Sequence, residues 1–318
     1  MLYNACMKPA FQWIPVGVEG GLDEANLSAH LIAPVGSDAY VMADAGTIQS
    51  GLRALAHAGC FAQIQPRAGL TLEGTVLHDH VKAFLISHPY LDHLQGMVTA
   101  SPTDAPKPLM SLAGVIGDIR DHVFNWRTWP NFGTEGEPPV LGQYTYVRLA
   151  PGVPTPIEGT GMTVEALPLA HGEHTDSAAF LIESGGRYVL YMGDTGPDEV
   201  EKSTKTAELF RRITPLVKAG RLHAVSIETS YVDERADEML YSHLTPKWVM
   251  KAFAGLAAMV DSGNPESALR GLRVLITHIK PDFSTGRPVR ERVTEQLHAQ
   301  NSLGLELVFL EQGRVYKV

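Results

Sequence analysis

The stretch Ser87-His88-Pro89-Tyr90-Leu91-Asp92-His93 is the most informative part of this chain, because it brings two imidazoles, a carboxylate and a phenol to the end of a strand. The preceding run, residues 81–86, is short and apolar and predicts a buried strand. The following residues, 94–98, indicate the start of a helix. Side chains alternate on an extended segment, so we expect residues 88, 90 and 92 to share one face while His93 turns away.

Other imidazoles and carboxylates follow apolar runs elsewhere in the chain. His171, Asp194 and His278 each come at or just after the end of such a run. Taken singly, each has an ordinary alternative, such as a turn residue or a buried histidine with satisfied hydrogen bonds. Together they predict strand ends that meet at one shared edge of a sheet. His and Asp are ligands that divalent metal ions prefer, so this edge is a candidate metal site.

Composition and patterning predict a large layered α/β fold. The chain has 318 residues, of which 44% are hydrophobic, and strands followed by helices recur in both halves. That pattern suits two β-sheets packed together with helices outside, which is a four-layer αββα sandwich. No fixed-period repeat divides the chain, so we expect residues 1–318 to form a single domain. The Pro-rich residues 102–108 are expected to be irregular.

The charge and the cysteine content limit the classes of partner and of metal site that we expect for this chain. The formal net charge of -9 disfavours nucleic acid as a partner, whereas a small anionic substrate stays compatible if bound cations reverse the local field. The two cysteines, Cys6 and Cys60, predict neither a disulfide framework nor a Cys-based zinc site. No apolar run has transmembrane length and no signal peptide is visible, so we expect no membrane partner. The compartment stays open between cytoplasm and periplasm, and a homodimer is one open oligomeric state.

The segment from His88 to Pro102 resembles the class II cyclic-nucleotide phosphodiesterases of the metallo-β-lactamase superfamily. The matching parts are Leu91-Asp92-His93-Leu94, Gly96-Met97-Val98 and Ser101-Pro102. Tyr90 stands where the His-x-His-x-Asp-His motif of the family has its second His. The resemblance extends over nearly the whole chain. It implies a metallo-β-lactamase-like fold and a small-molecule cyclic nucleotide, cAMP or cGMP, as the substrate that is opened to a 5′-nucleotide.

The resemblance also implies two divalent metal ions as cofactors, with zinc as the first choice and manganese or iron as alternatives. By the family pattern, His88 and His171 hold the first ion and Asp194 is shared. Asp92, His93 and His278 complete the ligand set of the second ion. The resemblance further places Asp44 under the site as a support for the ligands.

Tyr90 leaves open whether the site of the first ion has its full set of ligands. A neutral phenol, with an ordinary pKa near 10, is a poor ligand. A phenolate is a known metal ligand, so one reading keeps Tyr90 in the site. In the other reading it only fills space. Our hypothesis is that the first site is weakened and the second is intact.

Cleavage of a phosphodiester needs a proton for the departing sugar oxygen. His243, in Ser242-His243-Leu244-Thr245-Pro246, is the candidate general acid, and Glu228 is the candidate carboxylate that orients it. Asp92 joins these two in the expected catalytic set. The His243 pair resembles that of related tRNA-processing nucleases. The alternative for His243 is a residue at the entry of the following helix.

Three residues are candidates for contact with the substrate. Asn125 and Trp129 lie in an aromatic stretch, residues 124–132, that is either core or a wall on which a purine stacks. Lys280 is either a phosphate contact or a surface lysine. Two further function classes stay open: another hydrolase of the superfamily, acting on a phosphoester, lactone or thioester, and a cyclic-nucleotide-binding protein weakened in catalysis by Tyr90.

Overall fold

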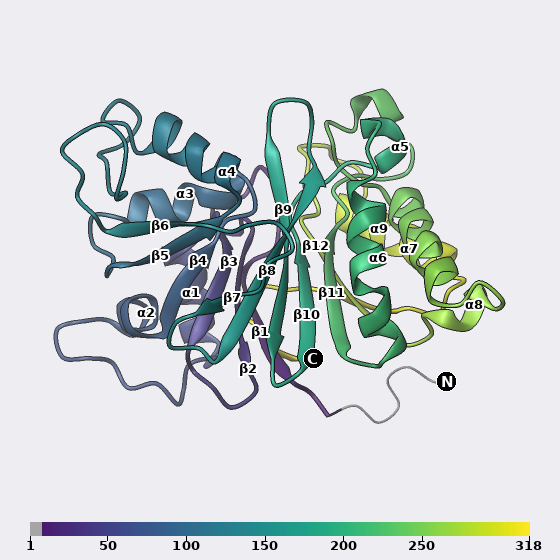
Figure 1. The fold of residues 1–318 in the computed structure, drawn as a ribbon, viewed down its shortest axis with the longest axis horizontal. Helices are drawn as coiled ribbons and strands as arrows, with labels where there is room; N and C mark the ends of the chain where they lie inside the picture. The colour runs from purple at the N-terminus through teal and green to yellow at the C-terminus, as the bar shows by residue number, and fades with distance from the viewer. Residues whose placement is uncertain (1–7) are drawn as a thin grey trace.

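Two β-sheets pack face to face in the computed structural model, which describes residues 8–318 (Figure 1). Helices α3 and α4 lie outside one sheet, and α6, α7 and α9 lie outside the other. The predicted αββα sandwich is therefore confirmed. Cys6, and the N-terminal residues considered for a signal peptide, lie outside the described residues. None of the helices in residues 8–318 combines the length and apolar character needed to span a membrane.

The first sheet has the strand order β14-β1-β2-β3-β4-β5-β6. From β3 to β6 neighbouring strands are parallel, and the remaining pairs are antiparallel. Its strands are β1 (Phe11–Gly17), β2 (Ala29–Pro34), β3 (Tyr40–Ala45), β4 (Val81–Leu85), β5 (Lys107–Ser111), β6 (Tyr144–Arg148) and β14 (Tyr316–Lys317).

The second sheet has the strand order β13-β12-β11-β10-β9-β8-β7. Strands β10 to β13 are mutually parallel, and β8 runs in the same direction as β10 because both are antiparallel to β9. The carboxyl ends of β8, β10, β11 and β12 therefore face one end of the sandwich. Its strands are β7 (Thr155–Ile157), β8 (Met162–Ala170), β9 (Asp176–Ser184), β10 (Arg187–Met192), β11 (Leu222–Glu228), β12 (Arg273–Thr277) and β13 (Glu306–Phe309).

Most helices follow a strand and return the chain to the next one. Two of them, α2 and α4, continue into a π-helical turn, η1 (Val76–His80) and η2 (Ile119–Val123) respectively, and a short 3₁₀ turn is η3 (Asp237–Met239). The α-helices are α1 (Gln49–His57), α2 (Leu72–Thr75), α3 (Leu91–Ala100), α4 (Ala113–Asp118), α5 (Asp198–Glu201), α6 (Lys205–Lys218), α7 (Pro246–Val260), α8 (Pro265–Ala268) and α9 (Val289–Gln300).

The sandwich has two apolar layers. One lies between the sheets, where Trp13, Phe180 and Tyr191 are almost fully buried, and it continues into apolar residues of α1, α3 and α4 beside the first sheet. The other lies between the second sheet and its helices, where the rings of Phe210 and Phe253 pack with centroids 5.6 Å apart. Burial of aromatic side chains on this scale fixes the two sheets and the helices in one arrangement.

Two expectations about local structure were wrong or incomplete. The irregular stretch expected at 102–108 ends earlier, because Lys107 already pairs with Tyr144 in the parallel ladder of β5. Helix α6 had no counterpart among the expected elements. Pro215 stands within it and interrupts the signal that a helix usually gives.

Candidate metal centre

Six strands deliver polar side chains to the same end of the sandwich. The expectation of one shared sheet edge was wrong: β3 and β4 belong to the first sheet, and β8, β10, β11 and β12 belong to the second. The polar residues at or directly after these strand ends are Asp44, Ser87, His88, His171, Asp194, Glu228 and His278. The site therefore lies across the junction of both sheets.

Helix α3 begins earlier than its sequence indicates. It starts at Leu91, after Tyr90 in extended backbone (φ -76°, ψ 152°). Asp92 and His93 therefore lie in the first helical turn, and residues 88, 90 and 92 do not share the face of one extended segment. An acidic side chain is favourable in a first turn because it faces the positive end of the helix dipole.

All six predicted metal ligands converge in one cluster of side chains. The Oδ2 atom of Asp194 lies 3.2 Å from Nε2 of His93 and 3.2 Å from Nε2 of His278. It also lies 3.8 Å from Nε2 of His88. Four combinations of three residues place their ligand atoms within 4.8 Å of one another: His88, His93 and Asp194; Asp92, His93 and His278; His171, Asp194 and His243; Glu228, His243 and His278.

Two of these imidazoles are fixed by acceptors behind them. Nδ1 of His93 lies 2.7 Å from Oδ2 of Asp44, and Nδ1 of His171 lies 3.1 Å from the carbonyl oxygen of Ser242. Both partners can only accept, so each Nδ1 carries the proton. The Nε2 lone pair of each ring is therefore directed into the cluster, as in the histidine ligands of metal sites.

Serine hydroxyls impose the same tautomer on the other two rings. Ser87 donates to Oδ2 of Asp44 at 2.7 Å, so its oxygen accepts from Nδ1 of His88 at 3.0 Å. Ser230 donates to Oε2 of Glu228 at 2.6 Å and accepts from Nδ1 of His278 at 3.0 Å. Four buried imidazoles thus present four Nε2 lone pairs to one space.

This arrangement fits bound cations. Nε2 of His88 and Nε2 of His171 are buried without a hydrogen-bond partner among the described residues. Nε2 of His93 and Nε2 of His278 face each other at 3.0 Å. Facing lone pairs repel, and buried unpaired acceptors are unfavourable, unless a positive charge lies between them. The donor set therefore suits divalent metal ions such as zinc.

The electrostatic field among these side chains also favours a bound cation. Burial, and secondarily His93, lowers the pKa of His88 well below its usual range. Burial also lowers the pKa of His171. On His93 burial acts in the same direction, but the carboxylates of Asp194 and Asp44 outweigh it and raise its pKa well above the ordinary value. A site that draws a proton onto one imidazole attracts a metal ion by the same field.

Asp44 lies behind the metal-ligating histidines and supports them through hydrogen bonds. Its carboxylate accepts from the Ser87 backbone N–H at 2.7 Å, the Ser87 hydroxyl at 2.7 Å, His93 Nδ1 at 2.7 Å and the Tyr191 hydroxyl at 2.5 Å. Its backbone is in the left-handed region, with φ 52°. His278 has φ 55°, and Gly20 packs so closely on its ring that a Cβ there has no room. Such strained backbone is held at sites where geometry matters.

Replacing Asp44 by Asn is expected to weaken metal binding by about 10–100-fold, the usual effect of losing a carboxylate behind a histidine ligand. The amide nitrogen cannot accept, so at least one of the four donors loses its partner. A competitive chelator titration measures the affinity. Asp23→Asn is the matched control, because it changes an exposed carboxylate whose Oδ1 accepts from the Ala25 N–H and is kept as an amide oxygen. An unchanged affinity in folded Asp44→Asn protein contradicts the supporting role.

His243 and Glu228 form a pair beside Asp194. Nδ1 of His243 lies 3.0 Å from Oε1 of Glu228 and 3.6 Å from Oδ2 of Asp194. Glu228 also accepts from the backbone N–H groups of Thr195 at 3.1 Å and Leu244 at 3.2 Å. Burial opposes its ionisation, yet His243, and secondarily His278, hold the pKa of Glu228 below its usual value. A fixed carboxylate thereby orients the imidazole.

Tyr90 and Lys280 lie beside the ligands. The ring of Tyr90 is 4.9 Å from that of His88 and 5.1 Å from that of His171, and its hydroxyl accepts from Thr175 at 3.1 Å. Nζ of Lys280 lies 3.4 Å from Oδ2 of Asp92. Burial works against its charge, but Asp194 and Asp92 raise its pKa, so it carries a positive charge at the cluster.

The structure does not bring Asn125 and Trp129 to this cluster through any contact within residues 8–318. Asn125 accepts from the backbone N–H groups of Arg127 and Thr128 and so closes a local turn. Trp129 packs against the apolar core that includes the first sheet, and its Nε1 donates to Ser101 at the end of α3 at 3.1 Å. These contacts are structural, and the substrate-binding role of both residues stays a prediction.

Sequence reasoning missed the residues that orient the ligands. Ser87, Ser230 and the carbonyl of Ser242 fix three imidazoles, and Tyr191 donates to Asp44. A signal was present for Ser230, because residues two apart on an extended segment point the same way and Glu228 is two residues before it. The role of Tyr191 depends on the packing of the two sheets, which no local pattern reveals.

Comparison with known proteins gives consistent results. The family model of class-II cAMP phosphodiesterases matches residues 11–313. A 3′,5′-cyclic-nucleotide phosphodiesterase of Aliivibrio fischeri is 38% identical over 306 residues, which are 96% of this chain and 92% of that protein. A probable 3′,5′-cyclic-nucleotide phosphodiesterase of Yersinia pestis is 35% identical over 314 residues, 98% of this chain and 90% of that protein.

Solved structures show the same fold at low sequence identity. Unliganded yeast PDE1 superposes with a TM-score of 0.81 at 18% identity, covering 98% of this chain and 100% of that chain. The metallo-beta-lactamase fold protein YhfI from Bacillus subtilis has a TM-score of 0.58 at 14% identity, covering 97% and 99%. Zn(2+)-bound PqqB from Methylobacterium extorquens has a TM-score of 0.58 at 15% identity, covering 96% and 100%. The sandwich is therefore metallo-β-lactamase-like.

Proposed function

Because the chain belongs to the class-II cAMP phosphodiesterase family, we propose that it hydrolyses the 3′,5′-cyclic phosphodiester of cAMP or cGMP to the 5′-nucleotide. The observation that carries this proposal is the convergence of four Nε2 lone pairs and the Asp194 carboxylate in one buried cluster. Such a donor set is typical of hydrolytic metal centres.

In this proposal two divalent ions, preferably zinc, are held by the predicted ligands. Bound there, such a pair supplies a hydroxide near neutral pH and neutralises the phosphoryl oxygens during in-line displacement. Asp194 is the proposed shared carboxylate because its Oδ2 lies 3.8 Å from Nε2 of His88, in the first ligand set, and 3.2 Å from Nε2 of His93 and of His278, in the second. The two ligand sets are His88, His171 and Asp194, and Asp92, His93, His278 and Asp194.

His243 is the proposed proton donor to the departing 3′ oxygen. Its Nδ1 is engaged by Glu228 at 3.0 Å, which leaves Nε2 as the nitrogen that exchanges a proton with substrate. Lys280 is held by Asp92 with its positive charge at the cluster, where it attracts the cyclic phosphate.

Tyr90→His is expected to tighten binding of the first ion by about tenfold or more, because an imidazole replaces a poor ligand beside His88 and His171. Tyr90→Phe is the matched control and is expected to leave metal affinity unchanged. Metal content after dialysis, with cAMP turnover on the same samples, measures both. Wild-type protein that retains two ions as tightly as Tyr90→His contradicts a weakened first site, and a loss of metal in Tyr90→Phe identifies Tyr90 as a ligand.

A substrate panel tests the proposed reaction. The metal-supplemented chain is expected to convert cAMP or cGMP to the 5′-nucleotide and to leave a homoserine lactone and a thioester unchanged. Turnover of only the lactone or thioester supports another hydrolase of the superfamily. Binding of cyclic nucleotide without turnover at any metal concentration supports a binding protein instead. Formation of the 3′-nucleotide contradicts the assignment of the departing oxygen.

A further inference from the structure

A basic pocket lies at the end of the second sheet that is opposite the metal centre. Its volume is about 520 Å³, and its lining contains Lys8, Arg187, Arg221 and His223 besides glycines of the β9–β10 turn and of the loop before β11. Strand β10 begins at Arg187 and β11 directly after Arg221, whereas the metal ligands follow the carboxyl ends of their strands. The six residues of β10, at about 3.3 Å each, place this pocket about 20 Å from the metal centre.

One nearly buried histidine in the lining lacks a partner. His223 is only 5% exposed, and neither ring nitrogen makes a hydrogen bond within residues 8–318. Both nitrogens keep contact with solvent, in contrast to the partnerless Nε2 atoms of His88 and His171. A polar group buried to this degree normally has a hydrogen-bond partner, so His223 marks a place for a polar group that enters the pocket from solvent.

The positive charges around His223 have no counter-ion among the described residues. The side chains of Lys8 and Arg187 make neither an ion pair nor a hydrogen bond within residues 8–318. Arg221 donates from Nε to the carbonyl oxygen of Gly186 at 2.6 Å, and its guanidinium lies 5.1 Å from the ring centroid of Tyr188. These contacts hold Arg221 in place and leave its charge unpaired.

The carboxylates beside the pocket are already engaged. Glu183 accepts from the backbone N–H of Gly186 at 2.6 Å, and Glu306 pairs with Arg273 at 3.0 Å. Residues 1–7 contain no acidic side chain in their sequence. In a chain of net charge -9, an unneutralised group of basic side chains in one hollow is a specific feature.

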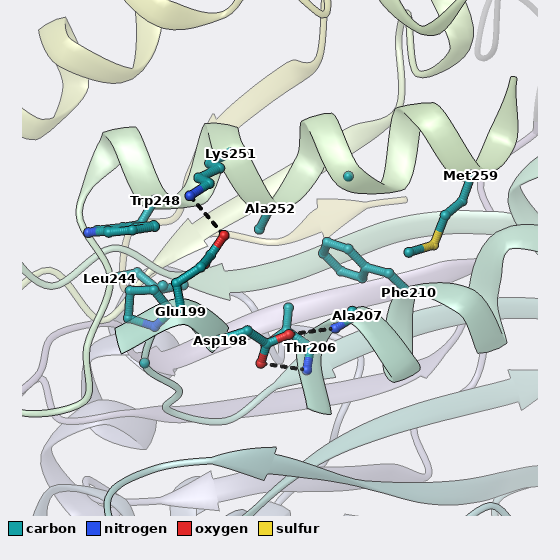
Figure 2. Close-up of a pocket in the computed structure, with 13 residues that line it drawn as sticks. Asp198, Glu199, Thr206, Ala207, Phe210, Leu244, Trp248, Lys251, Ala252 and Met259 are labelled. Carbon is teal, nitrogen blue, oxygen red and sulfur yellow. Dashed lines mark hydrogen bonds and ion pairs between the residues drawn. The ribbon is translucent and has the colours of Figure 1, made fainter. Parts of the chain in front are cut away.

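The positive field reaches His223 itself. Burial, and secondarily the charges of Arg187 and Arg273, lowers the pKa of its imidazole. The apolar space between α5, α6 and α7 differs in this respect, because Lys251 there pairs with Glu199 at 2.8 Å (Figure 2). The basic pocket therefore attracts an anion, whereas the charges beside the apolar space balance each other.

We propose that the basic pocket binds a small phosphorylated molecule with at least two negative charges, held by Arg187, Arg221, Lys8 and the ring N–H of His223. Guanidinium groups bind phosphate oxygens through paired N–H donors. Pockets of several hundred Å³ accommodate small ligands. The overall negative charge disfavours a broad anionic surface such as a membrane as the occupant. This binding site does not depend on the proposed phosphodiesterase function.

His223 provides a reporter that separates this pocket from the metal centre. The metal-loaded full chain is labelled with ¹⁵N in its histidine rings, and the His223 signal is identified by its loss in His223→Gln. Fructose 1,6-bisphosphate is the probe and fructose the neutral control. The bisphosphate is expected to shift the His223 signal with a dissociation constant below about 1 mM, and fructose to leave the signal unchanged.

Charge-removing variants test which side chains bind the probe. Arg187→Gln is expected to weaken binding at least about tenfold, the scale of one hydrogen bond to a charged group. Arg187→Gln combined with Arg221→Gln is expected to abolish it. Arg211→Gln is the matched control, because Arg211 is exposed on α6, has no ion pair within residues 8–318 and lies outside the lining. Its affinity is expected to equal that of wild type.

Four outcomes overturn the proposal. A bisphosphate that leaves the His223 signal in place and shifts only the metal-ligating histidines binds at the metal centre. Equal affinity in wild type and Arg187→Gln removes the pocket as the site. Equal weakening in Arg187→Gln and Arg211→Gln assigns binding to overall charge. Tighter binding to vesicles of phosphatidylcholine and phosphatidylserine than to the bisphosphate, lost in Arg187→Gln, assigns the pocket to a membrane surface.

Discussion

Asp194→Asn is expected to abolish cyclic-nucleotide hydrolysis, with turnover falling at least about a thousandfold. This exceeds the roughly 10–100-fold effect of a partner behind the ligands, because Asp194 itself belongs to the cluster. Its Oδ2 is 3.2 Å from both His93 Nε2 and His278 Nε2, and burial opposes its charge while these histidines hold its pKa well below the usual range. A neutral amide cannot balance the charge of the proposed metal ions at that point.

The loss in Asp194→Asn should coincide with loss of metal. Turnover and metal content are measured on the same samples, and at least one ion per chain is expected to be missing. Asp261→Asn is the control, because Asp261 is exposed and its Oδ1, which accepts from the Gly263 N–H at 3.0 Å, is kept in asparagine. Asp194→Asn protein with two ions and more than about a tenth of wild-type turnover excludes Asp194 as the shared ligand.

His243→Ala is expected to lower turnover of cAMP by about a hundredfold or more with metal content unchanged, the usual scale for loss of a general acid. Metal content must be measured together with turnover, because His243 also belongs to two of the groups of residues that could hold an ion. A fall in metal content together with turnover identifies His243 as a ligand. Unchanged turnover removes it from the mechanism.

A second substrate separates proton donation from general damage to the site. Bis-p-nitrophenyl phosphate releases p-nitrophenolate, which is a stable anion and needs little protonation. If His243 donates the proton, its replacement by Ala should affect this substrate far less than cAMP. Glu228→Gln keeps the shape of the pair and removes its charge, so it should show the same selectivity with a smaller effect. An equal loss on both substrates contradicts proton donation by His243.

The layers of the fold were predictable because most strands are short apolar runs that end at a turn. Residues 81–86 are predicted from such a run and agree with β4 to within one residue. Helix α6 was not predicted, because Pro215 stands inside it and its amphipathic face becomes meaningful only against the second sheet. Local sequence therefore predicts individual strands and helices well, but it predicts poorly which of them pack against one another.

The candidate site was predictable in its residues more than in its geometry. The position of His88, His171, Asp194 and His278 at strand ends is visible in the sequence. Their approach from two different sheets is not visible in the sequence, because it depends on how the first sheet packs against the second. The start of α3 at Leu91 was also missed, since Pro89 and Tyr90 favour extended backbone.

The hydrogen bonds behind the ligands were beyond sequence reasoning for a physical reason. Asp44 meets His93 and Tyr191 across sequence separations of 49 and 147 residues. Such contacts are formed only by the packed sandwich. Their effect is to fix each imidazole with its Nε2 lone pair inward, which is the feature that points most clearly to metal.

The most direct test of the account is cAMP hydrolysis by the purified chain before chelation, after chelation and after metal is restored, with metal analysis of each sample. We predict turnover to the 5′-nucleotide that disappears as the ions are removed and returns when two equivalents of zinc or manganese are added. Full turnover in metal-free protein, or no turnover of cyclic nucleotide when both ions are bound, contradicts a metal-dependent phosphodiesterase built on these residues.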